Sequence, residues 1–262
     1  MVDKQLNVGR LSSLLDGSTI GADLHYFVEI DSTNRALRDL PEGSWCHGTV
    51  VITDYQTAGR GRQGRSWAAP PGSSLLLSTA LAWPEQCPLA QSVMLGALAI
   101  LDTVERVSEL TATLKWPNDV LLNGRKVCGI LAETATAESQ RFVILGTGLN
   151  VNFDVGRVAG ISGAATSLQL ECGRLVDREA LAAALFTALD YWYERLTRDR
   201  SAIFSAWERR LDVRGQHLTV TDAGGTWTGV ATGVDPAGGL HLTREDAGRE
   251  TVYAADVSIR SH

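Results

Sequence analysis

The sequence is poor in cysteine and has no long apolar run, and each shortage excludes a class of protein. The four cysteines are scattered and form no Cys-x-x-Cys pair: Cys46, Cys87, Cys128 and Cys172. This spacing indicates neither a disulfide framework nor a zinc site, so we expect reduced, buried thiols in a cytoplasmic protein. No apolar stretch approaches the roughly 20 residues of a membrane-spanning helix, and the N-terminus lacks a signal peptide's apolar centre, so we expect no membrane contact.

Positive charge is the minority sign, because 24 Lys and Arg residues stand against 30 Asp and Glu, for a formal net charge of −6. An acidic chain disfavours a broad nucleic-acid-binding surface, and we expect no DNA binding. With 262 residues the chain can bury a full core. One large domain with a small appendage is the natural expectation for this length.

Acidic residues are absent from positions 55–84, and three arginines stand together inside that stretch. The loop reads Gly59-Arg60-Gly61-Arg62-Gln63-Gly64-Arg65-Ser66-Trp67. Glycines let backbone N–H groups crowd around an anion, and guanidinium groups bind phosphate or carboxylate oxygens with two hydrogen bonds. The loop therefore predicts an anion site, with phosphate as the leading candidate. An ordinary basic surface loop remains the alternative.

Two familiar phosphate-binding motifs match this loop only superficially. The dinucleotide fingerprint and the Walker A loop both need a helix directly after the glycines, because the helix N-terminus holds the phosphate. Here Pro70-Pro71-Gly72 follows, and the next periodic segment, 74–82, is typical of a strand. A strand–loop–strand arrangement excludes both motifs.

Hydrophobic periodicity predicts an α+β main domain followed by a small β-barrel. Strands are expected at 26–30, 49–55, 74–82, 112–116, 119–123, 126–133 and 141–146. Helices are expected at 11–15, 89–107 and 201–211. Two more are expected with polar caps at their starts, one that follows the cap at 31–34 and ends near Asp39, and one that begins at Asp177 and ends near Leu196. Asn123-Gly124 is a type I′ hairpin signal. Residues 216–260 show only short β-like pieces between glycine-rich turns, which predicts the barrel.

A second group of polar residues surrounds the expected hairpin. Lys115-Trp116-Pro117-Asn118-Asp119 ends one strand, and Lys126 begins the strand that returns. Folding back at Asn123-Gly124 would bring Lys126 close to 119–121. The alternative is a hairpin with solvated lysines and Pro117 as a bulge or edge residue. Further along, the glycines of 146–150 permit either a close ligand or a bulge.

Together these segments closely resemble biotin–protein ligases. The matching strings, in order, are Asp31-Ser32-Thr33-Asn34, Gln56 to Trp67, Lys115 to Asp119, Arg125 to Leu131 and Gly146 to Asn150, with weaker matches at Ala165 to Leu168 and Val257 to Arg260. The resemblance covers about residue 26 to the end. One such string can arise by chance, but five in the same order are not expected to.

The resemblance implies a mixed-sheet catalytic domain with flanking helices over 26–212, of the class II tRNA synthetase-like biotin ligase fold, and an SH3-like β-barrel over 213–262. Residues 1–25 would be too short for the helix-turn-helix domain of members that repress transcription. The implied reaction forms biotinyl-5′-AMP and pyrophosphate from biotin and Mg·ATP. Biotin then passes to a lysine of the biotin carboxyl carrier domain of acetyl-CoA carboxylase or a related carboxylase. A homodimer is left open.

The resemblance also implies a role for each matching residue. Lys126, Arg60 and Arg62 would be catalytic, with Lys126 bridging the biotin carboxylate and the α-phosphate. Biotin would be bound by Ser32, Thr33, Asn34, Gln56, Gly59, Arg60, Gly61, Arg62, Trp67, Lys126, Gly129, Gly146 and Gly148. ATP would be bound by Arg62, Arg65, Lys115, Trp116, Asn118, Asp119, Lys126, Asn150 and Arg260. Asp119 would contact Mg²⁺, which prefers carboxylate and phosphate oxygens.

Three alternatives remain at this point. Trp67 can be a plain core tryptophan. A lipoate or octanoate ligase or transferase shares the architecture, although those relatives lack a Gly-Arg-Gly-Arg loop paired with Lys-Trp-Pro-Asn-Asp. A non-enzymatic interaction protein, built around the barrel, is the third.

Overall fold

A computed structural model gives the fold of the chain. It describes residues 5–41, 43–158, 161, 164–211, 213–222, 224–244, 248–253 and 256–259, with backbone only for the last range. Within these ranges none of the helices combines the length and apolarity that a bilayer crossing requires.

A seven-stranded mixed sheet forms the centre of the larger part of the molecule, in the order β1-β2-β3-β7-β6-β5-β4. Only β1 and β2 run parallel, and every other neighbouring pair is antiparallel. The strands are β1 (Leu24–Ile30), β2 (Val50–Gln56), β3 (Ser74–Ala82), β4 (Ala112–Lys115), β5 (Asp119–Leu122), β6 (Arg125–Ala137) and β7 (Gln140–Asn150). The predicted α+β class and mixed sheet are confirmed.

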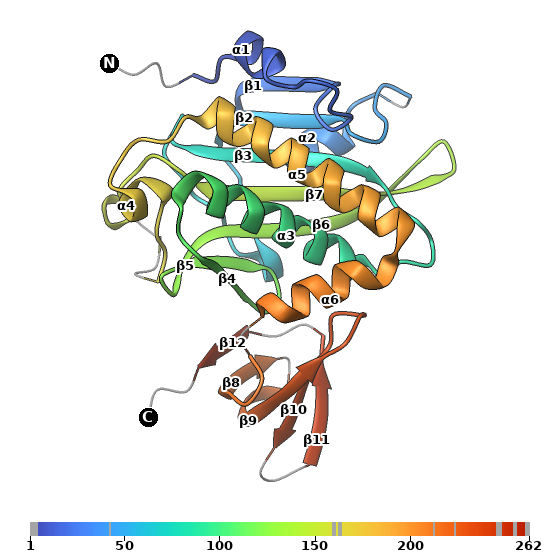
Figure 1. The fold of residues 1–262 in the computed structure, drawn as a ribbon, viewed down its shortest axis with the longest axis vertical. Helices are drawn as coiled ribbons and strands as arrows, with labels where there is room; N and C mark the ends of the chain where they lie inside the picture. The colour runs from blue at the N-terminus through green and yellow to red at the C-terminus, as the bar shows by residue number, and fades with distance from the viewer. Residues whose placement is uncertain are drawn as a thin grey trace.

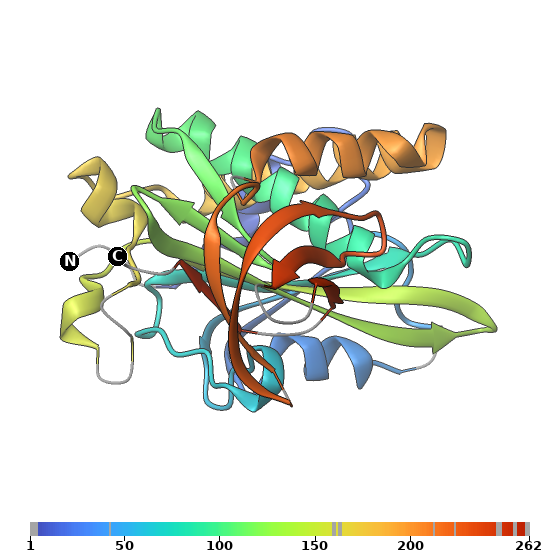
Figure 2. The same ribbon diagram turned by 90° about the horizontal axis from the view of Figure 1, so that it is seen from below.

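Helices cover the two faces of this sheet unequally. Figure 1 shows α3, α5 and α6 side by side on one face, and Figure 2 shows α2 on the opposite face. The helices are α1 (Val8–Ser13), α2 (Thr33–Arg38), α3 (Leu89–Ser108), α4 (Leu168–Cys172), α5 (Arg178–Arg198) and α6 (Arg200–Arg210). Helix α5 begins at its predicted cap, where Asp177 Oδ1 accepts a hydrogen bond from the Ala180 N–H (3.1 Å). The short α4 was not predicted.

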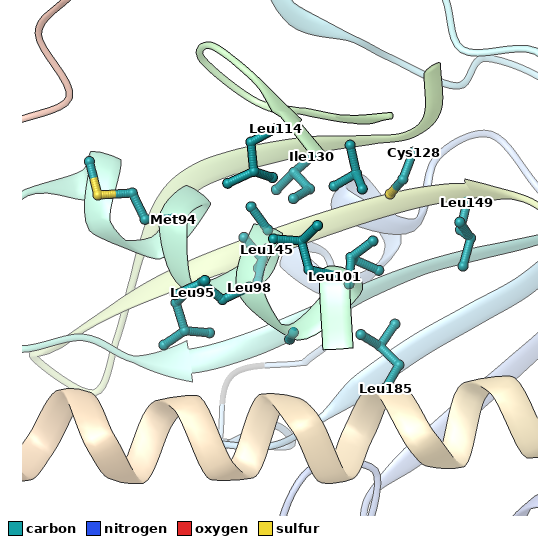
Figure 3. Close-up of a cluster of buried hydrophobic side chains, with 14 of the residues drawn as sticks. Met94, Leu95, Leu98, Leu101, Leu114, Cys128, Ile130, Leu145, Leu149 and Leu185 are labelled. Carbon is teal, nitrogen blue, oxygen red and sulfur yellow. The ribbon is translucent and has the colours of Figure 1, made fainter. Parts of the chain in front are cut away.

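The main core lies between the sheet and helices α3 and α5 (Figure 3). Leu95 and Leu101 of α3, Leu145 of β7 and Leu185 of α5 are each fully buried there. Burying a leucine completely stabilises the fold by about 2 kcal/mol. Helix α3 is buried on most of its surface because the sheet, α5 and α6 all pack against it.

Strand residues alternate between this core and a smaller one on the α2 side. Val50 and Ile52 point into the main core, whereas Val51 between them joins a cluster with Leu37 of α2 and Phe142 of β7. This alternation is the period of two that a strand covered on both faces shows. The α2 side therefore has its own apolar cover over part of the sheet.

A second sheet of five strands, in the order β11-β10-β9-β8-β12, makes up the C-terminal part. It lies below α6 and β4 in Figure 1. Its strands are β8 (His217–Asp222), β9 (Gly225–Val234), β10 (Leu240–Arg244), β11 (Gly248–Val252) and β12 (Asp256–Ile259). Their buried side chains include Leu218, Val220, Leu240 and Leu242. The predicted small β domain is confirmed.

Two local predictions were wrong. Among the four free thiols only Cys87 and Cys128 are buried, since Cys46 is exposed in the loop before β2 and Cys172 is half-buried at the end of α4. Ser32 occupies the N-cap position of α2 but makes no side-chain cap hydrogen bond. The polar side chains that follow it face the site described next.

Candidate active site

A cleft of about 420 Å³ lies on the α2 side of the sheet, where that face changes from large to small side chains. Along β7, Phe142 and Ile144 pack under α2, and Gly146 and Gly148 continue the same face. A Cβ atom on Gly146 would lie 2.3 Å from Asn34 Oδ1. Glycine is required here because other side chains already approach the backbone closely.

Sheet register extends this glycine floor towards charged residues. Gly148 lies opposite Gly129 of β6, Gly129 opposite Asp119 of β5, and Asp119 opposite Lys115 of β4. Directly opposed residues in adjacent antiparallel strands point to the same face. A flat surface at one end of the cleft therefore leads to a carboxylate and a lysine at the other.

A hydrogen-bond network that ends on the Glu133 carboxylate shapes the wall next to α2. The Thr33 N–H donates to Gln56 Oε1 (2.8 Å), and the Ser78 hydroxyl donates to Asn34 Oδ1 (2.6 Å). Asn34 Nδ2 in turn donates to Glu133 Oε2 (2.7 Å). These bonds fix the orientation of the Asn34 amide, so the wall presents donors and acceptors in a set order.

Glu133 also faces the arginines near this wall. Its carboxylate lies 3.8 Å from Arg60 Nη2 and 3.5 Å from Arg38 Nη2. Neither Ser78 nor Glu133 was predicted as a site residue. The available signal was a hydroxyl or carboxylate inside a strand that is otherwise apolar or small.

The arginine loop is a tight hairpin that covers one side of the cleft. The Trp67 N–H donates to the Gly59 carbonyl (2.9 Å) and the Gly61 N–H to the Arg65 carbonyl (2.7 Å) around a single 3₁₀ turn, η1 (Arg62–Gly64). No α-helix follows before β3, which agrees with the exclusion of Walker A and dinucleotide motifs. The loop projects its arginines towards the cleft.

Trp67 packs over the paired glycines. A Cβ atom on Gly148 would lie 2.5 Å from its Cε2 and one on Gly129 2.9 Å from its Cζ3. The indole is only partly buried, and its Nε1 has no hydrogen-bond partner among the described residues. Trp67 is therefore part of the cleft lining and not a core tryptophan.

Charged groups gather at the far end of the cleft. Lys126 Nζ lies 2.7 Å from Asp119 Oδ1 and 5.4 Å from the centre of the Trp67 ring. Arg62 Nη1 donates to Asn118 Oδ1 (3.3 Å), and burial lowers the pKa of the Arg62 guanidinium from its ordinary value, although Asp119 acts in the opposite direction. The cleft thus joins a wall of Ser32, Thr33, Asn34 and Gln56 side chains to an end where Lys126, Arg62 and Asp119 gather.

A β-bulge in β6 aims Lys126 into the cleft. Val120 pairs with Cys128 but the next residue, Leu121, pairs with Lys126, so Val127 is the extra residue. Val127 and Cys128 both point into the core. Bulges re-aim side chains next to functional sites. Here the bulge leaves Lys126 and Gly129 on the same side.

Most residues predicted for the site line the cleft together: Ser32, Thr33, Asn34, Gln56, Arg60, Gly61, Arg62, Arg65, Trp67, Lys115, Trp116, Asn118, Asp119, Lys126, Gly129, Gly146 and Gly148. Gly59 lies at the base of the loop, and Asn150 lies beyond the cleft lining at the end of β7, where its Nδ2 donates to the Thr166 carbonyl (2.9 Å). Arg260 is outside the described residues. The cleft lining also includes residues that were not predicted: Gln63, Ser66, Pro117, Ile130, Leu131, Thr147 and Thr221.

The C-terminal sheet closes one side of the cleft. Thr221 of β8 is part of the lining, and Trp116 Nε1 donates to the Gly238 carbonyl (3.0 Å). The peptide bond between Trp116 and Pro117 is cis, in the turn that joins β4 to β5. The turn that carries Asn118 therefore also contacts the barrel.

Two family models match the chain. Residues 26–150 match the biotin/lipoate A/B protein ligase family, and residues 214–260 match the biotin protein ligase C-terminal domain. A biotin–[acetyl-CoA-carboxylase] ligase of Paracoccus denitrificans is 35% identical over 239 residues, which span 87% of this chain and 96% of the relative. The chain belongs to the biotin protein ligases.

Other relatives and a solved structure agree with membership of this ligase family. A biotin–[acetyl-CoA-carboxylase] ligase of Mycobacterium tuberculosis is 36% identical over 241 residues, covering 88% of this chain and 86% of the relative. The biotin protein ligase of Aquifex aeolicus, solved in complex with biotin and ATP, superposes with a TM-score of 0.75 at 26% identity and covers 92% of this ligase and 100% of that chain. The fold predicted from the resemblance is confirmed.

Proposed function

We propose that this biotin ligase works in two steps within the cleft. Biotin and ATP first form biotinyl-5′-AMP and pyrophosphate, and a lysine of a biotin carboxyl carrier domain then takes the biotin. The carrier we propose is that of acetyl-CoA carboxylase or a related biotin-dependent carboxylase. Residues 26–212 would form the catalytic domain and 213–262 the barrel that closes it.

A single observation carries the proposal: the glycine floor runs from a wall of hydroxyl and amide side chains to an end rich in cations. The ring system of biotin carries no charge and suits the wall formed by Ser32, Thr33, Asn34 and Gln56. Its carboxylate would point along the floor towards Lys126. Two anions repel each other, so bringing a carboxylate against a phosphate requires fixed positive charges.

In the first step a biotin carboxylate oxygen bonds to the α-phosphorus, and the bond from that phosphorus to the pyrophosphate oxygen breaks. Lys126 would lie between the carboxylate and the α-phosphate, and Arg60 and Arg62 would bind the oxygens from the loop side. Lys115, Trp116 and Asn118 would contact the nucleotide. Fixed positions and fixed charges account for most of the catalysis in such transfers.

Asp119 suits a shared Mg²⁺ ion because it supplies a carboxylate beside the place proposed for the phosphates. Among the described residues no group of three or more His, Cys, Asp and Glu side chains gathers to hold a metal. We therefore propose that Mg²⁺ binds mainly through ATP, where it would offset phosphate charge, with Asp119 as its protein contact.

In the second step the lysine amine attacks the acyl carbon of the mixed anhydride. The bond from that carbon to the phosphate oxygen breaks, AMP leaves, and the amine releases its proton to solvent. A mixed anhydride also reacts with water and stray amines, and a covering loop would limit both reactions. The Gly59–Trp67 hairpin would provide this cover, and its position along one side of the cleft supports that role.

The test is to incubate the purified chain with Mg·ATP and biotin, octanoate or lipoate, and to identify the adenylate by mass spectrometry. A carrier domain is added afterwards to follow transfer. We expect biotinyl-AMP and a biotinylated carrier lysine. Turnover of octanoate or lipoate instead of biotin would point to the alternative acyl ligase of the same fold, and no adenylate at all would refute the two-step proposal.

A further inference from the structure

The segment 164–167 replaces β7 as the neighbour of β6 beside Lys126. Pairing between β6 and β7 begins at Cys128 and Leu149, so β7 does not reach Lys126. Instead, the Lys126 N–H donates to the Ala164 carbonyl (2.7 Å), and the Thr166 N–H donates to the Lys126 carbonyl (2.8 Å). The bridge between Lys126 and Ala165 is parallel. Both backbone hydrogen-bonding groups of Lys126 are thus held by this segment.

A buried carboxylate holds the same segment in place. Glu171 of α4 has a side chain only 3% exposed, and it accepts hydrogen bonds from Asn123 Nδ2 (2.6 Å), Arg125 Nη2 (2.6 Å) and the Thr166 hydroxyl. Asn123 and Arg125 stand on either side of Gly124 in the hairpin that leads to Lys126. Glu171 therefore ties this hairpin to the segment alongside it.

The charge on Glu171 is balanced by these contacts. Burial acts to raise its pKa, but the hydrogen bonds from Thr166 and Asn123 and the charge of Arg125 lower the pKa below its ordinary value. Asn150, the last residue of β7, adds a hydrogen bond from its amide to the Thr166 carbonyl (2.9 Å). The segment is consequently joined to β7, to β6 and to the hairpin at once.

Lys126 needs such support because it lies near the first residue of β6, two residues after Gly124 of the turn and next to the bulge at Val127. Its side chain is long, and a displacement of about 1 Å at a reacting group can cost about a hundredfold in rate. Backbone hydrogen bonds on the side away from β5 remove the freedom of the strand end to shift. Thr166 bonds the backbone carbonyl of Lys126, and Glu171 bonds the side chains of Asn123, Arg125 and Thr166. Neither Thr166 nor Glu171 lines the cleft.

We propose that Thr166 and Glu171 are positioning residues for the reaction, which act by fixing the backbone of Lys126. This inference rests on the role proposed for Lys126 above. It assigns a function to the Ala165-Thr166-Ser167-Leu168 string, whose side chains lie outside the cleft. Thr166 and Glu171 are not part of the cleft lining, where both substrates are proposed to bind.

Thr166→Val tests the proposal, because valine keeps the shape and loses the hydroxyl, and Thr166→Ser is the control that keeps it. At saturating ATP we expect Thr166→Val to lower kcat for biotinyl-AMP formation by about tenfold or more, as a small displacement of Lys126 predicts. The KM for biotin should stay within about twofold. Thr166→Ser should keep most of the activity.

Glu171→Gln provides an independent variant that removes the charge and keeps the size, and its melting temperature checks folding. Each variant is also combined with Lys126→Ala, which lacks the ammonium group that Thr166 and Glu171 are proposed to position. We expect no further loss in the double variants, since residues that act through one group are not additive. The inference would be overturned if Thr166→Val or Glu171→Gln lowered kcat by the same factor in the Lys126→Ala background as in the unaltered chain. It would also be overturned if kcat were unchanged in both Thr166→Val and Glu171→Gln.

The two proposals fail in distinguishable ways. If the unaltered chain makes no biotinyl-AMP, or Lys126→Ala keeps normal turnover, the proposed function of Lys126 is wrong. If the unaltered chain and Lys126→Ala behave as proposed while Thr166→Val and Glu171→Gln match the unaltered chain, only the positioning role is wrong.

Discussion

The ammonium group of Lys126 lies 2.7 Å from the carboxylate of Asp119. Both side chains are partly exposed to the cleft, at 33% and 20%. Each residue comes from a different strand of one hairpin, and the turn at Asn123-Gly124 brings them together. Because the ion pair is open to the cleft, an incoming anion can compete with Asp119 for the lysine.

Lys126→Ala should lower the rate of biotinyl-AMP formation at least a hundredfold. Removing one fixed charge from a transition state costs about 3–4 kcal/mol in activation free energy. Single-turnover formation of the adenylate, followed by mass spectrometry, measures the effect. Arg106→Ala, which removes an exposed cation in the last turn of α3 and outside the cleft lining, is the control and should have no effect. Near-normal turnover in Lys126→Ala would contradict its role.

Arg62→Gly should release biotinyl-AMP and biotinylate bystander proteins. Arg62 is half-buried in the loop and donates to Asn118 across the cleft, so its loss should loosen the cover over the adenylate. Streptavidin blots of added albumin measure the stray labelling. Gln63→Gly is the matched control, because Gln63 has a φ of 55° that glycine adopts easily and carries no charge. Equal selectivity in Arg62→Gly and the unaltered chain would rule out a lid.

Gly146→Ala should weaken biotin binding and leave the fold intact. The added methyl would lie 2.3 Å from Asn34 Oδ1, so the amide must move away from Ser78 and Glu133. Overpacking of this kind costs about 1–3 kcal/mol, and each 1.4 kcal/mol is about tenfold in Kd. Isothermal calorimetry with biotin measures the change. Gly9→Ala, where a methyl meets only Asn7 Oδ1 at 3.6 Å, should bind normally. Unchanged affinity in Gly146→Ala would mean that biotin does not use the Asn34 wall.

The contact between Arg10 of α1 and Asp177 at the start of α5 should make stability depend on acid pH. The hydrogen bond from Arg10 is the main reason that the pKa of Asp177 falls to about 2. A carboxyl group whose pKa is lower in the folded chain than in the unfolded chain stabilises the folded chain. The stabilisation is complete at a pH above the ordinary pKa of about 3.9, and it is lost as the pH falls through about 2. The relevant window is therefore about pH 4 to pH 2.

Asp177→Asn tests this contribution, because asparagine keeps the helix cap and removes the charge. Since Arg10 and Asp177 are 48% and 42% exposed, we expect a loss of at most about 1 kcal/mol in the free energy of unfolding at pH 7. Urea unfolding at several pH values should show the difference shrinking below pH 4. The exposed Asp16→Asn serves as the control. A difference that grows as the pH falls would contradict the assignment.

Local signals in the sequence predicted the elements that frame the site. The strand at 74–82 matches β3 at both ends, and the helix predicted from Leu89 extends to Ser108. Asn123 and Gly124 have φ values of 49° and 73°, as the type I′ signal requires. Each of these features depends on residues within one element, so periodicity and turn chemistry are sufficient to find it.

Contacts between distant elements could not be predicted in the same way. Asn34 and Glu133 are 99 positions apart and meet only because β7 carries glycine where α2 approaches. Asn150 follows Gly146 and Gly148 on the same face of β7 but lies beyond the cleft lining, where its amide bonds the Thr166 carbonyl, and its contact with the nucleotide stays a prediction. Thr221 entered the lining because the second sheet docks there. Register and docking depend on the whole fold.

The sequence alone determined that a glycine- and arginine-rich loop and a hairpin bearing a lysine would form. Anion binding by arginine and the turn preference of Asn-Gly are properties of the residues themselves and do not depend on distant contacts. Only the tertiary structure decided which of them share one cleft and which segment supports Lys126. That outcome follows from strand register, where a shift of one residue moves every side chain to the opposite face of the sheet.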